Sequence, residues 1–177
     1  MTNRRALLAS GLAFAASAVS AQSTNFLDRV GHILSVCPHV ELQKLAFGNE
    51  DRDRRTRFVT NLSWKNIGNK PLISFEIVLL KYDAFDQRLI GTRWTVEGKN
   101  SVDWRALAPG DIGSDGVIAY GSESVFTMIA YVRNARLGDG TVWHASDADV
   151  GAALRRVAPG IKEPGSLRPD PKPSKSE

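Results

Sequence analysis

The chain has 177 residues, a formal net charge of +4, three histidines and one cysteine. The positive excess is small and both signs are interspersed, which argues against nucleic acid or an anionic membrane surface as the partner. A single cysteine excludes a disulfide within the chain, so the fold must be held by its hydrophobic core.

Residues 1–21 are predicted to be a cleaved signal peptide. Arg4 and Arg5 form its positive start, an apolar run follows, and small residues including Ala21 precede the expected cleavage before Gln22. The arginine pair suits either a Sec or a twin-arginine export signal. Cleavage leaves 177 − 21 = 156 residues, enough for one domain. We therefore expect a periplasmic or secreted protein without stable membrane insertion after cleavage.

Residues 22–38 form an N-terminal segment whose structure the sequence leaves open. Phe26, Val30 and Ile33 have a spacing that suits a short helix. Gly31 disfavours that helix.

Residues 39–145 are predicted to form an antiparallel, immunoglobulin-like β-sandwich. Apolar and polar residues alternate from Val40 onward, turn formers separate the alternating runs, and no helix intervenes. Trp64 shares a strand face with Phe58 and Leu62, so it is expected to lie between the sheets. The second half of 72–82 is apolar on both faces, which predicts a central strand covered on both sides. The remaining strands are predicted at 88–97, at 116–120, from Val125 to the glycines near 138, and at 141–143.

One helix is predicted to close the domain at residues 146–158. Ser146 and Asp149 have the spacing of an N-terminal cap, and an apolar stripe follows at helical spacing. Residues 159–177 are rich in proline and poor in apolar side chains, which predicts a disordered tail.

Part of the chain resembles the small secreted immunoglobulin-like domains of the FxLYD kind. The resemblance spans residues 58 to about 120 and rests on three motifs: Asn66-Ile67-Gly68, Tyr82-Asp83 and the Leu-x-Pro-Gly turn at 107–110. The chain departs from the family motif at Leu79, where the family has Phe, and at Lys81, where it has Leu. The resemblance implies an immunoglobulin-like fold, and it supports fold more than function.

Motifs that carry chemistry are scarce. The chain has neither the G-x-S-x-G nucleophile motif nor a glycine-rich phosphate loop. We therefore predict that the protein is not an enzyme and uses no cofactor. Trp104, in an irregular polar stretch beside Arg105, is the aromatic residue most suited to an exposed ligand-binding role. With Arg105 it would suit a sugar-binding module.

The cysteine and two of the histidines lie close together in sequence. His32, Cys37 and His39 offer imidazole and thiolate, the ligands that copper and zinc prefer. Structural zinc sites need four ligands at set spacings, and this set has three. Free cysteine is one of the most buried residue types, so Cys37 is predicted to be a buried, inert thiol.

Two functions follow from these observations. The first is an exported, non-enzymatic β-sandwich module that binds a protein or a cell-envelope component through an edge strand or its loops. The alternative is a periplasmic metal-binding protein that uses His32, Cys37 and His39.

Overall fold

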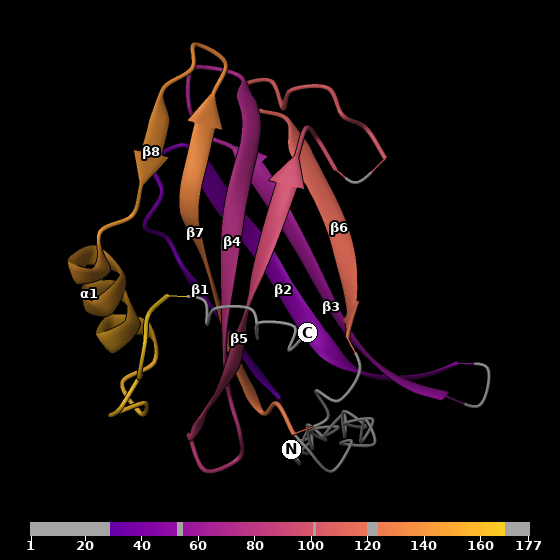
Figure 1. Cartoon of the computed structure of the whole chain (residues 1–177), viewed down its shortest axis with the longest axis vertical. Helices are drawn as coiled ribbons and strands as arrows, with labels where there is room; N and C mark the ends of the chain where they lie inside the picture. The colour runs from indigo at the N-terminus through magenta and orange to yellow at the C-terminus, as the bar shows by residue number, and fades with distance from the viewer. Residues whose placement is uncertain (1–28, 53–54, 101, 120–123, 169–177) are drawn as a thin grey trace, which may run out of the picture.

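Two β-sheets stack face to face in a sandwich-like arrangement (Figure 1). The computed structural model describes residues 29–52, 55–100, 102–119 and 124–168. The predicted signal peptide, residues 22–28 and residues 169–177 lie outside these ranges. The three-stranded sheet has the order β2 (Val40–Arg52), β3 (Arg55–Asn66), β6 (Ile112–Ala119). The five-stranded sheet has the order β1 (Val30–Leu34), β7 (Thr127–Leu137), β4 (Leu72–Tyr82), β5 (Arg88–Glu97), and β8 (Val142–His144) also pairs with β7.

The core between the sheets is built by the inward-facing residues of the alternating strands. Trp64 is fully buried there, and its ring meets Phe75 at 5.4 Å and Trp94 at 6.0 Å between centroids, both edge to face. Edge-to-face pairs at these distances are favourable because the positive ring edge meets the negative face. The prediction that Trp64 lies between the sheets is confirmed.

The prediction of an antiparallel sandwich is correct only in part. Strands β2, β3 and β6 pair antiparallel, as do β4, β5, β7 and β8, whereas β1 pairs with β7 in parallel. The segment left open between helix and loop is therefore a strand over Val30–Leu34, because its apolar residues pair with β7 instead of packing as a helix face. The sandwich consequently begins before residue 39.

Strand β6 begins four residues earlier than the sequence predicts. Its inward positions at the start of the strand are Gly113, opposite Trp64, and Asp115, opposite Leu62, so the apolar alternation is missing there. A Cβ on Gly113 would lie 2.4 Å from Nε1 of Trp64. Glycine is therefore needed at 113 to make room for the indole ring.

A helix covers part of the outer face of the five-stranded sheet. Helix α1 (Asp147–Val157) is capped by Ser146, whose hydroxyl accepts a hydrogen bond from the Asp149 amide at 3.0 Å, as predicted. Its buried residues join a second apolar core with residues of β1, β4 and β7. Among the described residues, no helix has both the length and the hydropathy that crossing a membrane requires.

The second half of β4 is buried on both faces, as predicted, because α1 and the following chain lie against it. We call the outer-face region under α1 the covered half; it consists of Leu34, Val78, Leu80, Tyr82, Ile129 and Tyr131. A second region of the outer face, which we call the open half, consists of Ser74, Glu76, Thr95, Asn134, Arg136, Val142 and His144.

Residues 159–168 differ from the prediction of a disordered tail, because they pack along the covered half. Ile161 is buried and Leu167 lies against the second core. The hydroxyl of Tyr82 donates to Pro164 O at 3.0 Å, and that of Tyr131 donates to Leu167 O. Two apolar side chains and two tyrosine hydroxyls thus supply the contacts that composition alone did not suggest.

Candidate functional site

The strongest candidate surface is the described part of the connection between β5 and β6, residues 98–100 and 102–111, which we call the Trp104 loop. It lies at the end of the sandwich where β5 ends and β6 begins (Figure 1). Trp104 is 68% exposed and Val102 is 86% exposed. An exposed apolar side chain forgoes the favourable free energy that burial would give it. Trp104 thus has the exposure that a ligand-binding role requires.

Hydrogen bonds within the loop order the backbone that carries this apolar pair. Asn100 Oδ1 accepts from the backbone amides of Val102 at 2.9 Å and Asp103 at 2.8 Å. The Asp103 carboxylate accepts from Arg105 Nε at 3.0 Å and Nη2 at 2.7 Å. These hydrogen bonds from Arg105 lower the pKa of Asp103 to about 2. The guanidinium of Arg105, the second predicted ligand-binding residue, is thus engaged within the loop itself.

Gly98 allows the loop to fold back on the end of β5. Its φ is +68°, and a Cβ there would lie 2.5 Å from the carbonyl carbon of Trp104. Only glycine combines this φ with so close a backbone approach at little cost. The main chain of Trp104 therefore lies close against Gly98 at the end of the strand.

Asn66 anchors the other end of the loop. Its side chain is buried, and Nδ2 donates to Lys70 O at 2.9 Å and to Leu107 O at 2.8 Å, while Oδ1 accepts from the Gly68 amide at 2.9 Å. The backbone amide of Gly110 also donates to Asn66 O at 2.9 Å. Asn66 therefore ties together two of the turn motifs on which the family resemblance rests.

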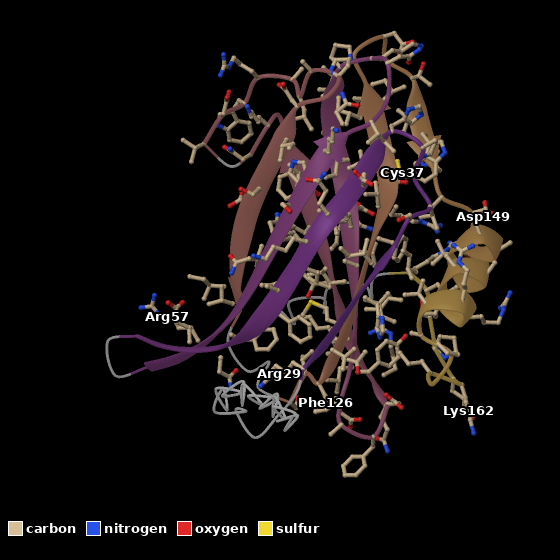
Figure 2. All side chains as sticks on the ribbon, turned by 180° about the vertical axis from the view of Figure 1, so that it is seen from behind. Arg29, Cys37, Arg57, Phe126, Asp149 and Lys162 are labelled. Carbon is tan, nitrogen blue, oxygen red and sulfur yellow. The ribbon has the colours of Figure 1, made fainter. Side chains whose placement is uncertain are left out.

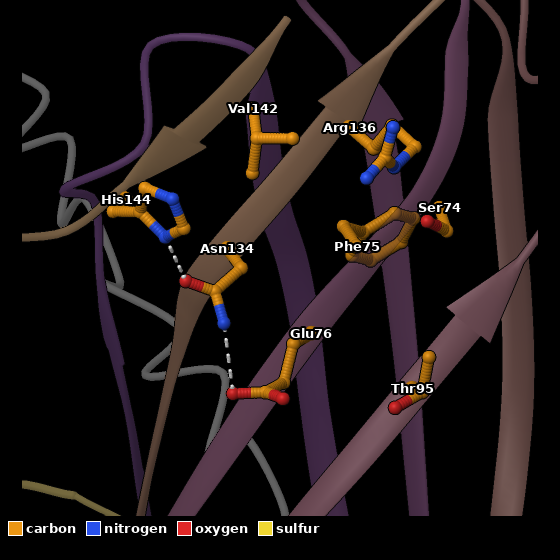
Figure 3. A pocket seen from close by; sticks show the side chains of 8 residues that line it. All are labelled: Ser74, Phe75, Glu76, Thr95, Asn134, Arg136, Val142 and His144. Carbon is orange, nitrogen blue, oxygen red and sulfur yellow. Dashed lines mark hydrogen bonds between the residues drawn. The ribbon is translucent and has the colours of Figure 1, made fainter. Parts of the chain in front are cut away.

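A second candidate is a row of polar side chains on the open half (Figure 3). The polar row consists of His144, Asn134, Glu76 and Thr95, which are directly opposite one another on β8, β7, β4 and β5. Asn134 Nδ2 donates to Glu76 Oε1 at 3.2 Å, and His144 Nδ1 lies 2.7 Å from Asn134 Oδ1. Arg93 Nε contacts the other oxygen of Glu76 at 3.0 Å.

The direction of these bonds sets the tautomer of His144. Because Asn134 donates to a carboxylate, its oxygen faces His144, and Nδ1 of His144 must carry the proton. Nε2 is then left as an acceptor at the surface. The row borders a shallow cavity of about 230 Å³ that Ser74 also lines. Among the described side chains, no hydrogen bond joins Ser74 to His144.

The structure does not bring the side chains of His32, Cys37 and His39 together into one group of ligands. No group of three His, Cys, Asp or Glu side chains within the described residues could hold a metal ion. His32 is on the same strand face as Leu34, whose side chain is in the second core. Cys37, between β1 and β2, belongs instead to the core between the sheets (Figure 2). The ring of His39 lies against the turn at Gly68.

Cys37 is a buried thiol, as predicted. Its exposed fraction is 7%, and burial raises the pKa of the thiol, although backbone hydrogen bonds from His39 and Val40 act in the opposite direction. The neutral form is therefore favoured at neutral pH, and it is a poor nucleophile.

Sequence reasoning missed both Asn66 as an anchor and the polar row. The N-x-G turn signalled Asn66 only as a turn former. The row was signalled by polar residues at every second position in otherwise apolar strands, but pairing across strands cannot be read from one strand at a time.

Comparison with known proteins bears on the fold. Neither protein-family models nor curated proteins gave a match. The chain is similar to the crystal structure of a hypothetical protein from Peptoclostridium difficile 630, with 13% identity and a TM-score of 0.51, over 68% of this chain and 91% of that one. It is also similar to the putative ApaA protein from Bordetella pertussis, with 11% identity and a TM-score of 0.40, over 62% and 89% of the two chains. The first likeness supports the β-rich, sandwich-like fold, and neither speaks to function.

Proposed function

We propose that this chain is an exported, non-enzymatic binding module that recognises a protein or a cell-envelope component through the Trp104 loop. The observation that carries the proposal is the exposed pair of Val102 and Trp104 on a loop whose backbone is held by hydrogen bonds at its apex, at Gly98 and at Leu107.

A loop whose backbone is already ordered is suited to binding because that backbone loses little conformational freedom on association. Binding must offset the cost of ordering any mobile loop, and a loop held beforehand avoids that part of the cost. Tryptophan is also among the residues that most often dominate binding energy in interfaces. Both considerations favour Trp104 as the central contact.

We further infer that the sandwich is of the immunoglobulin type. If β2 to β8 are lettered A to G, the sheets have the orders A-B-E and D-C-F-G. Immunoglobulin constant domains have A-B-E-D and C-F-G, so only the fourth strand changes sheet. This order agrees with the FxLYD resemblance, and domains of this architecture commonly bind through the loops at one end.

The exported location rests on the predicted signal peptide of residues 1–21. The non-enzymatic class rests on the missing nucleophile and phosphate-binding motifs. The sugar-binding reading draws less support, because Asp103 engages the guanidinium of Arg105.

Site-specific photo-crosslinking in the native envelope tests the proposal. A crosslinking amino acid at Trp104 is compared with one at Phe85, which is 83% exposed on the β4–β5 turn at the other end of the sandwich. We expect discrete adducts from position 104 and none from position 85, and their loss when unlabelled wild-type protein competes. Adducts that are equal at the two positions, or absent at 104, would contradict the proposal. Adducts with polysaccharide instead of protein would favour the sugar-binding reading.

A further inference from the structure

Strand β5 has an open edge with a defined hydrogen-bonding pattern. Among the described strands it ends the five-stranded sheet and pairs only with β4. The amide of Gly98 donates to Ile73 O at 2.9 Å, so Gly98 points its peptide groups towards β4. Because these groups alternate along a strand, those of Arg93, Thr95 and Glu97 point away from the sheet. No described residue accepts from or donates to them through its backbone.

The side chains along this edge carry a symmetric charge pattern. Arg93, Thr95 and Glu97 all lie on the outer face and are exposed. The basic residue precedes Thr95 by two positions and the acidic residue follows it by two. Charged residues on an edge strand normally discourage pairing. In an antiparallel pair centred on Thr95, however, each charge would meet its opposite.

We propose that a second copy of this chain pairs with the β5 edge, antiparallel and about a twofold axis at Thr95. In this register Thr95 lies opposite Thr95 of the second copy, and Arg93 lies opposite Glu97 on both sides of the axis. A two-residue shift places one of the charged residues opposite Thr95. A four-residue shift places Arg93 opposite Arg93 or Glu97 opposite Glu97. The charges therefore select one register and favour a second copy over an unrelated strand.

The pairing would also join the two polar rows. Thr95 ends the row His144–Asn134–Glu76–Thr95, so the axis at Thr95 makes the rows of the two copies continuous across one sheet. Arg93, which already contacts Glu76, would then lie between Glu76 of its own chain and Glu97 of the second copy. The two shallow cavities would share one face of the dimer.

Sedimentation of the exported chain over a range of concentrations tests the pairing. The register shift in the β4–β5 pairing between Leu79 and Lys81 leaves a regular free edge only along the C-terminal part of β5. The paired segment is therefore short, and we expect a reversible monomer–dimer equilibrium. Thr95→Pro should abolish the dimer, since it removes an outward amide and leaves the β4 ladder intact. Thr95→Val keeps that amide and should preserve the dimer. A chain that is monomeric at every concentration would overturn the proposal.

Charge reversal tests the register without proline. Glu97→Arg creates two like-charged pairs and should weaken dimerisation by about tenfold or more. Adding Arg93→Glu should restore it, whereas Lys44→Glu on the other sheet should have no effect. Failure of the double variant to recover, with its melting temperature unchanged, would overturn the register. These measurements do not involve Trp104, so they stand apart from the test of the proposed function.

Discussion

The covered and open halves of the five-stranded sheet lie on the same strands yet differ in composition. Under α1, the outward residues of β4 and β7 are apolar or aromatic and are fully buried, as with Leu80 and Ile129. Further along the same face, Glu76 and Asn134 are polar and partly exposed. The change coincides with a register shift between β4 and β7 at Glu76 and Ile77. Apolar outward residues on these strands thus coincide with the region that α1 covers, and polar ones with the region that it leaves open.

The largest effect is expected from removing the core residue that supports both halves. Trp64→Ala should lower the free energy of unfolding by about 3–5 kcal/mol, because it leaves a large cavity between the sheets. Urea denaturation should show one cooperative transition at lower midpoint, with both halves unfolding together. A variant that melts within a few degrees of the wild type would show that Trp64 is not central to the core.

A change in α1 should separate the two halves. Leu154→Ala removes a fully buried side chain from the second core and should cost about 2–4 kcal/mol. Amide exchange should quicken along the covered half, in β1 and the lower part of β7, more than around the polar row. Val142→Ala on the open half is the matched control and should change stability by less than about 0.5 kcal/mol. Uniform quickening in both halves would argue against their independence.

Asn66→Ala should destabilise the end of the sandwich that carries the Trp104 loop. The substitution removes the side-chain hydrogen bonds of Asn66 to the Gly68 amide and to the carbonyls of Lys70 and Leu107, which should cost about 1–3 kcal/mol. Exchange should quicken in residues 66–71 and in the Trp104 loop, with the covered half unchanged. Crosslinking from position 104 should fall as well, because the loop is no longer held at its base.

Alkaline pH should loosen the covered half first. Burial raises the pKa of Tyr131 to about 12, above its ordinary value near 10. The neutral phenol is therefore favoured by folding: its contribution is complete below pH 10 and is lost as the pH rises towards 12. Tyr131→Phe should cost about 0.5–1.5 kcal/mol at pH 7 by removing the bond to Leu167 O, and should flatten this alkaline decline. Ultraviolet absorbance of tyrosinate, followed during titration, provides the measurement.

The smallest effect is expected on the open half. Glu76→Ala removes the carboxylate that orients Asn134, so the amide can reverse and His144 should lose its preference for the Nδ1-protonated tautomer. Stability should change by less than about 1 kcal/mol, because the groups are partly exposed. Nitrogen chemical shifts of the imidazole report the tautomer directly. An unchanged tautomer would mean that Asn134 holds its orientation without Glu76.

Local sequence patterns predicted most strands and the helix, because the residues that define each of these elements are neighbours in the sequence. The buried side of Trp64 and the double burial of β4 follow from periodicity, and the cap at Ser146 follows from its spacing to Asp149. The pairing of β1 with β7 could not be predicted, because five residues of mixed composition do not identify a distant partner. The docking of Leu167 was missed for a related reason: its contacts are with Tyr131 and the second core, far away in sequence.

The parallel pairing of β1 with β7 has a consequence for the time course of folding. Val30 lies opposite Thr127, so the first described strand reaches its place only after nearly the whole sandwich has been synthesised. Closing so large a loop carries an entropic cost that must be met before the contact contributes any stability, and folding rates fall as contacts become more distant in sequence. We therefore expect β1 to join late, and the edge of β7 to stay uncovered in the intermediate that precedes it.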